Sequence, residues 1–163
     1  MVISIITATY NAAMTYQSWA ATKFSLQEMA DPASSGPDAN PAADGISNLL
    51  KYASHLDPHT AYTGDTRILT PDIGIHGLPS VTRTGDGILR VEFIQRTGTT
   101  GLNYTVQFGS DLTTGRPGGW MNATGLPAVT QTGNPNWNRV IVEDVPPPGA
   151  TIRFARVVVT ESP

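Results

Sequence analysis

Cysteine is absent from the 163-residue chain, which excludes disulfide bonds, thiolate metal sites and a cysteine nucleophile. Charged residues are also scarce, at 14% of the sequence, and the formal net charge is −3. The 10 Lys and Arg residues are scattered without a basic run, so we expect no nucleic-acid partner. No apolar run approaches the roughly 18 to 20 residues of a membrane-spanning helix, so we expect a protein that does not span a membrane.

Turn-forming residues are plentiful, with 16 Gly and 13 Pro. This composition favours a β-rich chain over a helical bundle. The length corresponds to one domain, or to one domain with a small helical appendage.

The N-terminal segment, residues 1–14, contains the apolar and β-branched string VISIITATY. It predicts a strand whose apolar side chains fall on both faces, and such a strand needs burial on both sides. The side chains concerned are Val2, Ile3, Ile5 and Ile6.

Residues 15–64 are predicted to form a helical segment. A first helix is expected over 15–30, where SLQE forms a capping box between Ser25 and Glu28. A second helix is expected from Ile46 to just before Pro58, because apolar residues recur there at helical spacing.

Residues 65–163 change to an alternating apolar and polar pattern. Strands are expected over 88–96, 103–112, 138–145 and 151–160, with a bulge between Phe154 and Val157, where the apolar phase shifts. The predicted fold is therefore mainly β: an antiparallel β-sandwich with a short N-terminal strand and a two-helix cap.

Residues 40–51 have the outline of a twelve-residue calcium-binding loop that leads into a helix. Such a loop needs oxygen ligands at positions 1, 3 and 5 and a bidentate carboxylate at position 12. Position 3 is Ala42, which has no side-chain oxygen, and position 12 is Lys51, a cation. A structural turn is therefore favoured over a calcium site, and no cofactor is expected. The positions of this degenerate loop are Asn40, Ala42, Asp44, Asn48 and Lys51.

The string YQSWAATKFSLQEMADPASSGPDANPAADGISNLLKYASHLDP, followed by LNYTVQFGSDLTT and ATIRFARVVVT, resembles the C-terminal region of large secreted bacterial surface proteins. In that family a W-x4-F helix precedes ADPDGDGLSNLLEYALGLDP, and a small sandwich follows with YTVEVSSDL and RFLRLRV strands. The resemblance covers about residues 16–160. It implies an extracellular module without catalytic activity.

Two tryptophans, Trp120 and Trp137, lie in Gly- and Asn-rich stretches. They can stack on sugar rings, bury in a neighbouring subunit, or pack over the ends of their own sandwich.

A metal site of histidines or a catalytic pair of aspartates is only weakly indicated. His55 and His59 are separated by Pro58, and the aspartates mostly sit beside Pro or Gly, where turns are common.

These observations favour a structural protein on the cell surface or outside the cell that associates with itself into a filament or surface assembly. The N-terminal strand is its expected link, inserted into the groove of a neighbour by strand addition. The alternative is an accessory module that binds carbohydrate, such as a cell-surface polysaccharide, or another cell-surface component. A hydrolase with paired carboxylates is the third class, but nothing in the sequence selects a pair.

Overall fold

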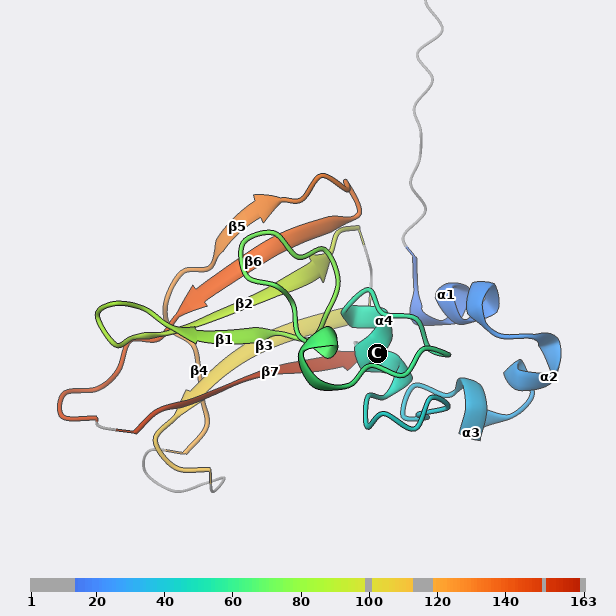
Figure 1. Cartoon of the computed structure of the whole chain (residues 1–163), viewed down its shortest axis with the longest axis horizontal. Coiled ribbons are helices and arrows are strands. Elements are labelled where there is room, and N and C mark those ends of the chain that lie inside the picture. The colour runs from blue at the N-terminus through green and yellow to red at the C-terminus, as the bar shows by residue number, and fades with distance from the viewer. Residues whose placement is uncertain (1–13, 99–100, 113–118, 151, 162–163) are drawn as a thin grey trace, which may run out of the picture.

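The computed structural model describes residues 14–98, 101–112, 119–150 and 152–161 (Figure 1). The predicted N-terminal strand, with Val2, Ile3, Ile5 and Ile6, lies outside these residues. The described chain forms two antiparallel sheets packed face to face, with short helices gathered at one end of the sandwich (Figure 1). The predicted mainly β fold and antiparallel sandwich are therefore confirmed.

Both sheets are built from short antiparallel strands. The four-stranded sheet has the order β1 (Ser80–Arg83), β2 (Leu89–Arg96), β6 (Trp137–Glu143) and β5 (Ala128–Gln131). The three-stranded sheet has the order β4 (Met121–Asn122), β3 (Leu102–Gly109) and β7 (Phe154–Glu161).

The sandwich core lies between the two sheets, where alternate residues of each strand face inward. Its buried members are Val91, Phe93, Val106, Phe108, Val140 and Val142. These are the positions that the alternating pattern of the sequence marks as apolar.

The predicted bulge in the last strand is wrong. The pairing of β3 with β7 is continuous from Leu102 opposite Glu161 to Gly109 opposite Phe154. Ala155 and Val157 pack against the sandwich core, and Phe154 therefore falls on the outer face. A small residue, Ala155, occupies a core position, so the apparent phase shift needs no extra residue.

Strand β2 is buried on both faces, although its sequence alternates apolar with polar residues. Glu92 and Ile94, on the side away from the sandwich core, are each 1% exposed. The chain after the short 3₁₀ helix η1 (Gly64–Arg67) covers them, and Leu69 packs there against Ile94 and Trp137. The Asp72 amide donates to the Glu92 carboxylate at 2.7 Å, and Arg139 forms an ion pair with the same group.

Four short α-helices take the place of the two predicted ones. The capping box is confirmed: Ser25 caps the second helix and Glu28 reaches back to the Ser25 amide at 2.7 Å. Because this cap starts a new helix, the first one ends at Phe24. The helices are α1 (Tyr16–Lys23), α2 (Leu26–Met29), α3 (Pro32–Ser35) and α4 (Asn48–Ala53).

An aromatic cluster holds the helical end together and joins it to the sandwich. Its buried members include Tyr16, Trp19, Phe24 and Tyr52. Leu102, the first residue of β3, packs against the same cluster. The start of β3 is therefore anchored at the helical end of the molecule.

Trp137 provides a direct test of how the helical end is attached. It is 3% exposed, stacks against His55 at 4.7 Å, and lies under the Arg96 guanidinium at 4.3 Å. Trp137→Ala should lower the free energy of unfolding by about 3 to 5 kcal/mol, measured by urea denaturation. Trp120→Ala, at a half-buried position, is the matched control and should cost clearly less. Equal losses for the two variants would contradict this placement of Trp137.

Candidate functional site

The degenerate loop keeps the shape of a metal-binding turn. Gly45 has a φ of 80°, in the left-handed region that favours glycine. One oxygen of Asp44 accepts from the Ile46 amide at 3.0 Å, and the other accepts from the Tyr62 amide at 3.0 Å. The carboxylate therefore faces inward and ties the turn to the chain beyond α4.

A lysine provides the positive charge in this loop. The Lys51 ammonium lies 2.9 Å from the Asp44 carboxylate and donates to the carbonyls of Pro58 and Thr60 at 3.2 and 3.0 Å. The side chains of Lys51 and Asp44 are both 0% exposed. A carboxylate and backbone carbonyls are typical calcium ligands, and here they surround an ammonium group instead.

The other positions of the loop do not join this pair. Asn40 accepts from the Asp44 amide at 3.3 Å, and Asn48 donates to the carbonyls of Ser34 and Gly36. Ala42 contributes no side-chain oxygen. Among the five loop positions singled out in the sequence, Asp44 contacts two others: its carboxylate pairs with Lys51 and its amide donates to Asn40.

The electrostatics of Asp44 agree with a fixed internal cation. Burial by itself raises the pKa of this carboxyl, but the hydrogen bonds from Tyr62, Lys51 and Ile46, with the charge of Lys51, outweigh burial. The pKa of Asp44 is therefore held below its ordinary value of 3.8. The carboxylate stays ionised and paired at neutral pH.

The two tryptophans have different surroundings. Trp137 is the first residue of β6 and is buried, so it offers no free ring face to a sugar. Trp120 is half-buried just before β4, and the Arg156 guanidinium lies 4.3 Å from its ring centroid. Arg156 also donates to Gln107, which donates to Asn122, so a polar row crosses the outer face of the three-stranded sheet.

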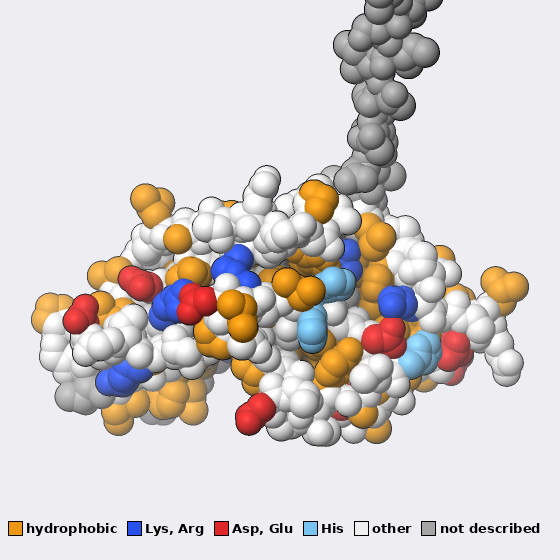
Figure 2. Space-filling model, turned by 45° about the horizontal axis from the view of Figure 1, so that its top comes forward, with side chains coloured by type: hydrophobic (Ala, Val, Ile, Leu, Met, Phe, Trp, Pro, Cys, Tyr) orange, Lys and Arg blue, Asp and Glu red, His pale blue; other side chains and the backbone are white. Residues whose placement is uncertain are grey.

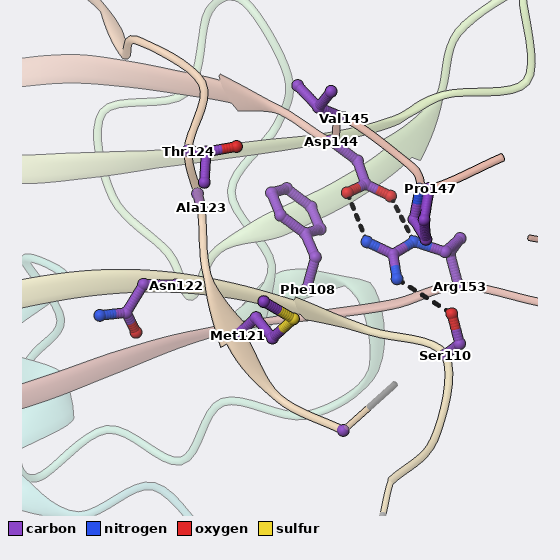
Figure 3. A pocket seen from close by; sticks show the side chains of 11 residues that line it. Phe108, Ser110, Met121, Asn122, Ala123, Thr124, Asp144, Val145, Pro147 and Arg153 are labelled. Atoms are coloured by element: carbon purple, nitrogen blue, oxygen red, sulfur yellow. Dashed lines mark hydrogen bonds and ion pairs between the residues drawn. The ribbon is translucent and has the colours of Figure 1, made fainter. Parts of the chain in front are cut away.

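A pocket of about 380 Å³ opens at the end of the sandwich away from the helices (Figure 3). Phe108 and Met121 contribute apolar surface to it (Figure 3). Arg153 lies at its edge and donates to both oxygens of Asp144, at 2.6 and 2.7 Å, and to Ser110 at 3.0 Å. The charged groups of this pocket are thus engaged with each other.

A second hollow, called here the lateral groove, opens on the long side of the sandwich and measures about 340 Å³. It reaches between the two sheets, because residues from the inner faces of both line it. The chain crossing from β4 to β5 forms its mouth. The lining residues are Phe93, Gln95, Tyr104, Thr105, Val106, Asn122, Ala123, Gly125, Pro127, Val129, Val140 and Val142.

Histidines and acids do not gather into a metal-binding cluster within the part of the chain that the structure describes. His55 Nδ1 donates to the Ile75 carbonyl at 3.0 Å, and His59 Nε2 lies 3.1 Å from the Glu28 carboxylate. Figure 2 shows acidic and basic side chains interspersed over one face, with apolar side chains between them.

The helices of the described residues are all too short or too polar to span a membrane.

Comparisons with known proteins provide no relative: no family model, curated protein or solved structure matches the chain.

The first prediction from this site concerns calcium. Because the Lys51 ammonium already pairs with the Asp44 carboxylate and the carbonyls of Pro58 and Thr60, thermal melts in chelator and in millimolar calcium should coincide. Differential scanning calorimetry measures the two midpoints. A calcium-dependent rise of several degrees would contradict a lysine-filled loop.

The second concerns the buried pair. Lys51→Met leaves the Asp44 carboxylate buried and unpaired, so it should cost about 3 to 5 kcal/mol of unfolding free energy. Lys23→Met, which breaks the half-exposed pair with Asp57 at 2.8 Å, is the control and should cost less than about 1 kcal/mol. Similar losses for both would show that the buried pair has no special role.

This pair also has a pH signature. Because the folded-state pKa of Asp44 is depressed, its contribution is present above the ordinary pKa of 3.8 and is lost as the pH falls through the folded value. In the Asp44→Asn variant, the loss of unfolding free energy that comes from protonating Asp44 should be absent from the stability measured at acid pH.

Proposed function

We propose that the protein is a non-catalytic, extracellular structural module that associates with copies of itself, and that the lateral groove is part of the contact. The observation that carries the proposal is the open side of the sandwich. There, inner-face residues such as Phe93 and Val140 line a groove that reaches the surface. A groove lined by apolar inner-face residues is a site where another chain can bury apolar area.

Exposed apolar side chains, in the groove and in two hollows that share lining residues with it, increase the area available for contact. Each is more than half exposed, at 51% to 96%. Burying them against a second copy removes apolar surface from water, which is the main favourable term in association. They are Met121, Leu126, Val129 and Val145.

The polar groups inside the molecule support a scaffold function over catalysis. Three carboxylates, those of Asp44, Glu92 and Asp144, are each at most 3% exposed and are paired with Lys51, Arg139 and Arg153. The carboxylates of Asp44 and Glu92 also accept hydrogen bonds from backbone amides. Such buried ion pairs hold elements of the fold together, and their charges are directed at each other and not at a substrate.

The extracellular location rests on the resemblance to secreted bacterial surface proteins. The helical cap and the sandwich that follows it have the order of elements which that resemblance implies. The absence of cysteine is compatible with any compartment.

Binding of a cell-surface polysaccharide is the second candidate, and Trp120 favours it. The tryptophan and the row of Arg156, Gln107 and Asn122 lie on one outer face. An aromatic ring next to hydrogen-bonding side chains suits the apolar face and hydroxyls of a sugar.

The test of self-association uses the full chain in sedimentation velocity over a range of concentrations. The expected result is an average mass that rises with concentration, reported together with electron microscopy of the most concentrated sample. A protein that remains monomeric up to about 1 mM would contradict the proposal, since its free energy of association would be weaker than about 4 kcal/mol.

The second candidate has a different signature. A monomeric protein that is retained on polysaccharide, and whose Trp120→Ala variant loses retention at an unchanged melting temperature, would support polysaccharide binding instead.

A further inference from the structure

Within the described residues, the pairing of strand β3 on the side of the lateral groove is short. Its pairing with β4 is confined to Gln107 and Phe108, with one more bond from the Ala123 amide to the Val106 carbonyl at 2.8 Å. Alternate residues of a strand direct their N–H and C=O groups to the same side. The backbone groups of Leu102 and Tyr104 therefore point to this side, where the described residues provide no pairing strand.

The groove lies directly beside this edge. Tyr104, Thr105 and Val106 line it from β3, and Val129 lines it from the edge strand β5 of the other sheet. A strand added next to β3 would place alternate side chains into the groove. It would thus gain main-chain hydrogen bonds and apolar burial together.

We propose that this edge of β3 accepts residues 2–6 of a second copy as an added strand, with Ile3 and Ile5 facing the groove. The inference rests on the proposed self-association and specifies its contact. The sequence of this segment suits the position, because apolar side chains on both strand faces need cover on both sides. An unpaired edge is the feature that invites such pairing.

The position of the chain at residue 15 favours a second copy as the donor. Thr15 and Tyr16 line a small pocket with Gly101 and Leu102, at the start of β3. If the chain continued back along the edge of β3 from Thr15, residue 11 would come opposite Val106. Residues 2–6 would then fall beyond Gly109, past the positions where β4 already pairs. Residues 2–6 of a neighbouring copy are not tied to Thr15 of this chain, so they can pair at Leu102 and Tyr104.

Donor and acceptor are different surfaces, so the contact is heterologous. Repeated from copy to copy, a heterologous contact makes a ring if the rotation closes and a filament if it does not.

The test mixes two full-length variants that are each defective on one side. Ile3→Asp/Ile5→Asp blocks the donor, and Val129→Asp blocks the acceptor at a residue that lines the groove. Val81→Asp, on the opposite edge strand β1, is the matched control, because Val81 and Val129 are 47% and 51% exposed. The readout is sedimentation velocity of each variant alone and of an equimolar mixture.

We expect each blocked variant alone to associate at least about tenfold more weakly than the unmodified chain, a free-energy loss of about 1.4 kcal/mol. The mixture should form a one-to-one complex, because it combines an intact donor with an intact acceptor, and the control should associate normally. A mixture that stays monomeric, or blocked variants that assemble normally, would overturn the inference and leave self-association standing. An unmodified chain that never associates would overturn both.

If Val129→Asp melts well below the control, cysteine pairs replace it, since the chain has no cysteine of its own. Ile3→Cys mixed with Val129→Cys should give a disulfide-linked dimer under oxidising conditions, while Ile3→Cys mixed with Val81→Cys should not. Equal cross-linking in both mixtures would also overturn the inference.

Discussion

The constraint on which this structure depends is the unequal size of its two sheets. In the part of the chain that the structure describes, four strands face three, and one of the three, β4, is only two residues long. The inner face of the larger sheet is therefore incompletely covered near β5 and β6, and the lateral groove is the result. An antiparallel sheet tolerates water on one face, but here the groove is lined by side chains of the inner faces, and Val129 of β5 is 51% exposed.

The helical end is held by a buried ion pair between Lys51 and Asp44. Lys51 also donates to the carbonyls of Pro58 and Thr60, which ties α4 to the chain that follows. Removing two charges from water is expensive unless they are paired and hydrogen-bonded. Asp44 and Lys51 meet both conditions through their mutual contact and their hydrogen bonds, and they tie the loop and α4 to residues 58–62.

Much of the fold could be predicted from the sequence because it rests on local patterns. Period-two alternation located β2, β3, β6 and β7, and the Ser25–Glu28 capping box located α2. The burial of Glu92 and Ile94 could not be predicted in this way, since the segment that covers them has no periodic signal. In the calcium-like loop the sequence predicted that Lys51 at position 12 disfavours calcium, whereas the burial of Lys51 against Asp44 depends on residues 58–62 folding back over it. The lateral groove depends on strand order and on the shortness of β4, which no local pattern encodes.

The central claim is that the edge of β3 gains a strand when copies associate, and hydrogen exchange tests it most directly. The amides of Leu102 and Tyr104 should exchange markedly more slowly in the associated protein than in a dilute sample. Amides of β1 at the opposite edge, such as that of Val81, should change little. Unchanged exchange at Leu102 and Tyr104 in a fully associated sample would contradict the account.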